Sequence, residues 1–227
     1  MCFVLLTLFS CSARIDGNLS ADGSAVLSVN MSLQRGMTAL IQRMFAAGGQ
    51  SAGQILDGPS IAASMSNAPG ITSVTLKNTA PASIEGQVVI SQISDFLAAT
   101  DGSGFITFKQ ERSGGHCVIN INRDNGPKML ELLSPEISDY LSALMAPIAT
   151  GEELSKSEYI ELVTSFYNKT ISDEIVSSRI RASINFPGNV TNVKGGIFSG
   201  RRVNFEILLI DLLVLDEPLI YEVTWTM

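Results

Sequence analysis

His116 and Cys117 are the two neighbouring residues of this chain best suited to nucleophilic chemistry. A cysteine becomes a nucleophile when a histidine on the same side lies within hydrogen-bond reach and takes its proton. Cys117 alternates with Ile119 and Ile121, which predicts a strand, and adjacent residues of a strand point to opposite faces. We therefore expect Cys117 on an apolar face, His116 on a polar face, and no catalysis by this pair.

Three charged motifs each have a chemical and a structural interpretation. Asp101-Gly102-Ser103-Gly104 resembles part of a calcium loop, but it lacks the further carboxylates of such a loop, so a hairpin turn is expected. Glu152-Glu153 could be an acid pair, yet solvated charges near a helix start are the expected role. Arg201-Arg202 could hold an anion, although such a pair more often begins an exposed strand.

The residue inventory argues against metal and cofactor chemistry. The chain has a single histidine and no Cys-x-x-Cys motif, which excludes histidine-rich zinc sites. No set of nucleophile, base and orienting residue stands out, so we predict that the protein is not an enzyme and has neither metal nor cofactor. A hydrolase is the disfavoured hypothesis, and a buried carboxylate pair with strongly perturbed pKa values in a cleft would support it.

Composition narrows the class of protein further. The 227 residues are 45% hydrophobic, which is enough for a substantial core. The net charge of −7 repels phosphate backbones, so nucleic-acid binding is not expected. An acidic surface does not favour anionic lipid head groups either, so membrane contact should come from acyl chains or an apolar site.

Two kinds of periodicity follow one another along the chain. Strands are predicted as a hairpin over residues 14–33, between Val74 and Ile90, as a hairpin around Ser113-Gly114-Gly115, and from Ile180 to the end. Helices are predicted over residues 37–45, after Pro59, after Ser134-Pro135, and after Ser155, where Glu158 completes a capping box. Residues 207–215 are expected to form a core strand or a short helix. The predicted fold class is α+β: a curved antiparallel sheet with helices packed on one face, strands at both ends of the chain and helices in the middle.

Methionines gather near the first hairpin and in the segment of small residues that follows it. Methionine is flexible and suits adaptable apolar sites, although it also fills gaps in ordinary cores. Both interpretations stay open. For a ligand site the candidate residues are Met31, Met37, Leu40, Met44, Phe45 and Met65.

The first residues of the chain form a short apolar segment. An apolar run ends in Leu8-Phe9-Ser10-Cys11, and the sequence then turns polar. This resembles the lipobox of bacterial lipoproteins, in which the cysteine is lipidated and becomes the new N-terminus. The resemblance implies a signal peptide over residues 1–10, lipidation of Cys11, and a single domain over residues 11–227. The run is too short for a transmembrane helix.

A second resemblance lies in the C-terminal third. Phe186-Pro187-Gly188, then Gly195-Gly196, and then Gly200 before Val203 and Phe205 are similar to the end of the LppM-type lipoprotein domain. That resemblance implies a sheet wrapped on helices around an apolar cavity, and a role in handling lipid-like molecules at the envelope. It covers residues 13–35 and 178–226 and supplies no catalytic residue.

Together these features predict a non-catalytic lipoprotein of the bacterial cell envelope. It is expected to be attached to a membrane by its lipid anchor, to face the periplasm or the exterior, and to bind or shuttle a lipid or similar hydrophobic ligand. The alternative is an envelope scaffold or a surface-exposed interaction protein. The identity of the ligand and the oligomeric state do not follow from the sequence.

Overall fold

The computed structural model describes residues 12–47, 55–99, 104–126 and 153–227. Cys11, the motif residues 101–103, Glu152 and the helix predicted after Ser134-Pro135 lie outside these ranges. The strands are β1 (Ser12–Leu19), β2 (Ala25–Ser32), β3 (Ile71–Ala80), β4 (Ser83–Ile90), β5 (Ile106–Glu111), β6 (Gly114–Ile121), β7 (Arg179–Asn185), β8 (Asn189–Lys194), β9 (Gly196–Ser199), β10 (Arg202–Leu208) and β11 (Leu219–Thr226). The helices are α1 (Arg35–Ala47), α2 (Gly58–Ser66), α3 (Ile93–Ala99), α6 (Lys156–Phe166), α7 (Lys169–Ser177) and α8 (Leu209–Val214).

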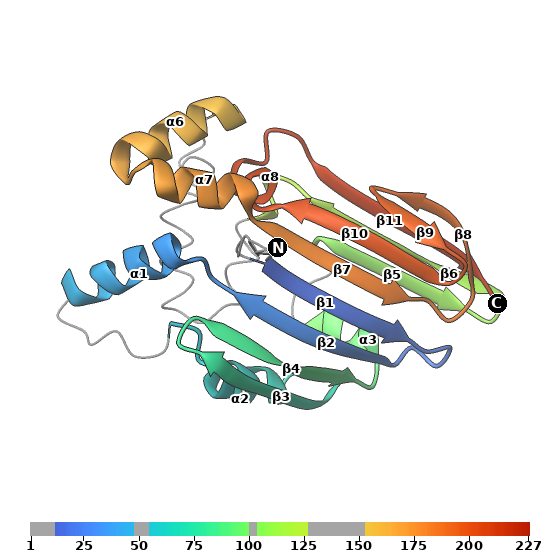
Figure 1. Cartoon of the computed structure of the whole chain (residues 1–227). Coiled ribbons are helices and arrows are strands. Elements are labelled where there is room, and N and C mark those ends of the chain that lie inside the picture. Colours follow the sequence, from blue (N-terminus) through green and yellow to red (C-terminus); the bar gives the residue numbers. More distant parts are fainter. Residues whose placement is uncertain (1–11, 48–54, 100–103, 127–152) are drawn as a thin grey trace, which may run out of the picture.

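The strands form two sheets (Figure 1). A large sheet has seven strands in the order β3-β4-β2-β1-β7-β10-β9, and a small sheet has four in the order β5-β6-β11-β8. The predicted α+β class is confirmed, as are the hairpins β1–β2 and β5–β6. The sheet differs from the expectation of a single antiparallel one, because β1 and β7 pair in parallel. This pairing joins the first described strand to one that begins after the last pair of long helices.

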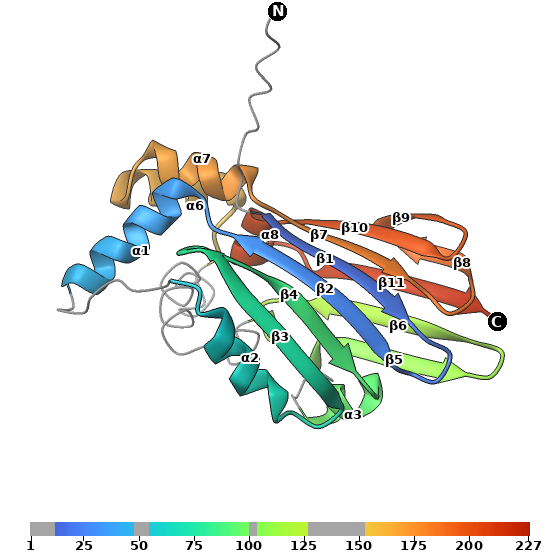
Figure 2. The ribbon, with the colours of Figure 1, turned by 60° about the horizontal axis from the view of Figure 1, so that its bottom comes forward.

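The helices α1, α6, α7 and α8 occupy one end of the molecule, and the C-terminus lies at the other (Figures 1 and 2). A buried cluster at the helical end includes Met37 of α1, Tyr159 of α6, Ile175 of α7 and Leu213 of α8. Apolar residues at helical spacing on each segment pack into this cluster, which is why these segments fold as helices here. Figure 2 shows α2 alongside β3, where Met65 packs against a cluster formed by β2 and β4.

Local capping signals fix the helix starts. The predicted capping box is confirmed: Ser155 Oγ accepts a hydrogen bond from the Glu158 backbone N–H at 3.3 Å, and the Ser155 N–H donates to Glu158 Oε2 at 2.8 Å. The start of α1 is capped from a distant part of the chain. Both carboxylate oxygens of Glu174 on α7 accept backbone hydrogen bonds at 2.8 Å, one from Gly36 and one from Met37. A single carboxylate thus ties α1 to α7 and stabilises the positive end of the α1 dipole.

A second buried cluster joins the two sheets at the end opposite the helices. Trp225 of β11 is 1% exposed and packs with Phe186, Val190, Val203 and Val223. Its ring centroid lies 4.9 Å from that of Phe186 and 5.9 Å from that of Phe108. The predicted alternation of β11, with Tyr221, Val223 and Trp225 on one face, is what brings this indole between the sheets.

Candidate functional site

The face of the large sheet that points toward the small sheet is apolar. Val203 of β10 lies on this face, since it packs with Trp225 of the small sheet. Phe205, two residues further along the same strand, meets the ring of Tyr221 edge-on at 5.5 Å. Successive side chains of a strand point to opposite faces, and residues directly opposite one another on paired strands share a face. The strand register therefore identifies the remaining residues of this inner face.

Six inner-face residues form two neighbouring rows across four strands. In one row Met31 lies opposite Ala13, Ala13 opposite Ile180, and Ile180 opposite Ile207. In the next row Val29 lies opposite Ile15. We name this set the inner apolar patch: Ala13, Ile15, Val29, Met31, Ile180 and Ile207.

Members of the inner apolar patch are less buried than Val203, Ile84 and Val88, which lie on the same face. All six are partly exposed, whereas Val203 is 0%, Ile84 3% and Val88 5% exposed. The five larger members also pack against none of the three buried clusters that the described residues form. Burial of the inner face is therefore incomplete at the six residues of the patch, which reach from the middle of β1 and β2 to the helical end of the strands.

The residues predicted for a ligand site divide among different places. Met31 belongs to the inner apolar patch. Met37 is 5% exposed and lies in the helical cluster with Leu40 against it, while Met65 packs under β3 and β4. Met44 and Phe45 are on α1, and their side chains lie outside the described set. Ile15, Val29, Ile180 and Ile207 were predicted from the sequence only as apolar strand or core residues. Their common position toward the helical end of four paired strands depends on the strand register.

His116 and Cys117 face opposite sides of the small sheet, as predicted. Cys117 packs with Trp225 and its neighbours between the sheets. His116 lies on the outer side, where its Nδ1 is 3.1 Å from Thr224 Oγ1. Burial raises the pKa of the Cys117 thiol from 9.0 to about 11, which disfavours the reactive thiolate.

Cys117 is therefore expected to resist alkylation in the folded protein. A pKa about two units above the ordinary value lowers the thiolate fraction at pH 8 about a hundredfold. With iodoacetamide at pH 8, peptide mapping should show little modification of Cys117 until urea unfolds the chain. Rapid labelling in the native state, at a rate unchanged by urea, would contradict this placement.

Ionic contacts reinforce the helical end. Lys156 Nζ at the start of α6 lies 2.9 Å from Asp211 Oδ1 on α8 and 3.6 Å from Asp216 Oδ1. The hydrogen bond and charge of Asp211 raise the pKa of Lys156. The lysine thus stays protonated where the two helices meet, and these charges hold the helices rather than forming a reactive group.

Comparisons with known proteins assign no family to this chain. No known protein family matches the sequence, and no curated protein matches it. Among solved structures, the chain is similar to the folded domain of the LppM protein of Mycobacterium tuberculosis, determined by NMR. The TM-score is 0.42 and the sequence identity 10%, over 96% of this chain and 90% of that one. This is a similarity of overall arrangement, and it assigns no site residue.

Proposed function

We propose that this protein is a non-catalytic envelope lipoprotein that binds the apolar part of a lipid or a similar hydrophobic molecule on the inner apolar patch. The observation that carries the proposal is the incomplete burial of the patch beside fully buried residues of the same face. Exposed contiguous apolar surface costs free energy in water, at about 25 cal/mol per Å². A ligand that covers the patch recovers this free energy, and aliphatic side chains such as Ile15 and Ile180 suit an acyl chain.

The start of the first strand supports the membrane anchor. β1 begins at Ser12, and Ser12 lies opposite Arg179, directly after α7. An acyl group on Cys11 would hold the folded domain close to the bilayer at its helical end. No helix within the described residues is long and apolar enough to cross a membrane. The proposed means of membrane association is a lipidated Cys11.

The first experiment is mass spectrometry. The chain from Ser12 onward is purified from a bacterial host without detergent, checked for folding by circular dichroism, and extracted with organic solvent. We expect a lipid in stoichiometric amount. In the full chain, the intact mass should show cleavage before Cys11 and added acyl groups, and Cys11→Ser should abolish both. A clean extract, with no gain in melting temperature on adding lipids, would count against ligand binding.

The alternative role, as an interaction or scaffold lipoprotein, is supported by one edge of the large sheet. β9 is a four-residue edge strand on which Ile197 is 72% and Phe198 47% exposed. Edge strands with exposed apolar residues offer unpaired backbone groups to another chain. A clean lipid extract together with concentration-dependent association, weakened by Ile197→Lys, would favour this role.

A further inference from the structure

The outer face of the large sheet carries a polar groove that the proposed function does not use. The groove has a volume of about 760 Å³ and lies over β1, β7, β9 and β10. Three adjacent strands supply its polar side chains. We name it the arginine groove, and these side chains are Arg14, Arg181, Ser183, Arg202, Asn204 and Glu206.

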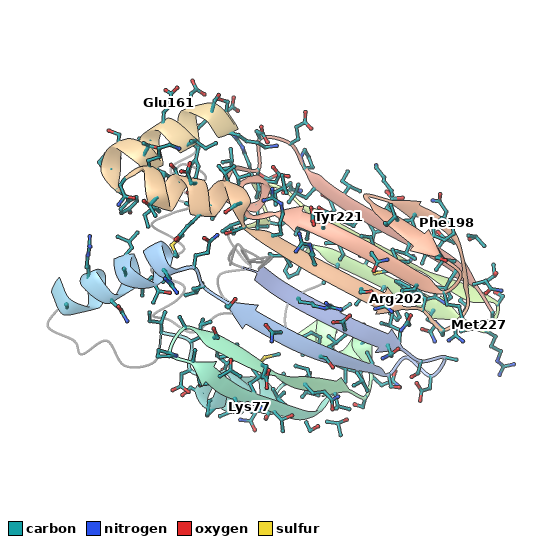
Figure 3. All side chains as sticks on the ribbon, viewed as in Figure 1. Lys77, Glu161, Phe198, Arg202, Tyr221 and Met227 are labelled. Atoms are coloured by element: carbon teal, nitrogen blue, oxygen red, sulfur yellow. The ribbon has the colours of Figure 1, made fainter. Side chains whose placement is uncertain are left out.

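Strand register concentrates positive charge in this groove. Arg14 of β1 lies directly opposite Arg181 of β7, on the face away from the small sheet. Like charges in directly opposite positions destabilise a sheet. Arg202 of β10 reaches the same area, since its Nε donates to Ser183 Oγ at 2.6 Å. Figure 3 labels Arg202 on β10 and, on β3 at the opposite edge of the large sheet, Lys77.

The arginines outnumber the carboxylates beside them. Asp16 is shared by Arg14, at 2.6 Å, and Arg202, at 3.4 Å. Glu206 is shared by Arg181, at 2.7 Å, and Arg179, at 3.7 Å. The three arginines that line the groove, set against these two carboxylates, leave a local excess of one positive charge in a protein whose net charge is −7. The groove therefore attracts anions that the rest of the surface repels.

Several guanidinium nitrogens in the groove remain available for a ligand. Arg181 donates to Glu206 through Nε, and Arg14 uses Nε and one Nη for Asp16. The other nitrogens of these two side chains have no hydrogen-bond partner within the described residues. The side chains of Arg14, Arg181 and Arg202 are 67%, 58% and 50% exposed, so a solute can reach them.

We propose that the arginine groove binds a phosphate group carried by a larger molecule. The flat guanidinium presents paired N–H donors that match phosphate oxygens, and a phosphate has enough oxygens to meet arginines from three strands at once. Ser183 and Asn204 add neutral hydrogen-bonding groups on adjacent strands. The volume falls in the range of small-molecule sites and exceeds the need of a single phosphate.

The test uses two probes that both carry phosphate: one is the free anion, and the other is a lipid head group. The purified full chain is titrated by calorimetry with inorganic phosphate, at constant ionic strength set by sodium chloride, and separately with dihexanoyl phosphatidic acid below its micelle concentration. We expect saturable binding that Arg181→Ala weakens about tenfold, as loss of a charge-assisted contact predicts. Lys77→Ala is the matched control: it removes one positive charge and the 3.0 Å pair with Glu85 on the same outer face, outside the groove.

Each outcome of this titration decides a specific point. Phosphatidic acid binding much more tightly than phosphate, with the same Arg181 dependence, identifies a lipid head group, whereas equal affinities identify a soluble phosphorylated molecule. Absence of saturable binding by both probes, or equal loss in Arg181→Ala and Lys77→Ala, overturns the proposal. The groove and the inner apolar patch lie on opposite faces of the sheet, so lipid loss from the patch leaves this result unaffected, and failure here leaves the proposed function standing.

Discussion

Replacing Trp225 with alanine is expected to lower the free energy of unfolding by about 3–5 kcal/mol. The indole is 1% exposed and contacts residues of both sheets, with aromatic neighbours at 4.9 and 5.9 Å. The backbone around it is built to its shape, since a Cβ on Gly115 would lie 2.1 Å from a ring carbon of Trp225. Truncation therefore leaves a large cavity that the two sheets cannot close. Urea unfolding followed by circular dichroism should show a lower midpoint with an unchanged slope.

Trp225→Phe is the control for this prediction. The Trp225 Nε1–H is buried and has no hydrogen-bond partner among the described residues, so phenylalanine removes an unsatisfied donor while it keeps an aromatic ring. We expect Trp225→Phe to cost less than about 2 kcal/mol, because it deletes only part of the volume. If Trp225→Ala also cost less than this, the cluster that joins the sheets would not be the core of the domain.

Features set by short stretches of sequence were predictable. The hairpin β1–β2, the start of α6 at its capping box and the alternation of β7 and β11 depend on residues close together in the chain. The segment 207–215 contains both predicted alternatives, because β10 ends at Leu208 and α8 follows. That helix ends at Val214, and the next residue, Leu215, has a φ of 47°. This left-handed conformation is usually adopted by glycine at a helix end, so the sequence gives no signal for it here.

Features set by contacts between distant residues were not predictable in the same way. Nothing in residues 12–19 indicates that their parallel partner is residues 179–185, and this pairing joins strands from both ends of the chain into one sheet. The helix α7 was also missed, although Asn168 caps it by accepting a hydrogen bond from the Ile171 N–H at 3.1 Å. One N-cap residue before a segment of nine residues is a weak sequence signal for a helix.

The candidate site shows the same limit. The prediction selected methionines for their flexibility, and it placed Met37 and Met65 with Met31 because they are near in sequence. The structure buries Met37 among helices and Met65 under β3 and β4. Alternation identifies which residues face inward, but only the arrangement of the two sheets decides which inward residues stay uncovered. This is why β-branched residues such as Ile15 and Val29 form the patch.

Substituting tryptophan at Val29 is expected to remove the bound lipid without unfolding the protein. Val29 is partly exposed on the inner face, with Ile15 on one neighbouring strand and Gly86 on the other. If the middle of this face is open to a ligand, an indole fills that space and competes with an acyl chain. We expect the lipid recovered in the organic extract to fall to about a tenth or less, with a stability change below about 1 kcal/mol.

Val88→Trp is the matched substitution in a covered part of the same face. Val88 is the same residue type on the adjacent strand β4, but it is 5% exposed and packed with Ala25 and Ile90. An indole there overpacks a filled core and should cost about 1–3 kcal/mol or more. The difference in the free energy of unfolding between the two variants decides whether the patch is open. If Val29→Trp destabilised the fold as much as Val88→Trp, the inner face would already be filled by protein, and the apolar patch would have no room for a ligand.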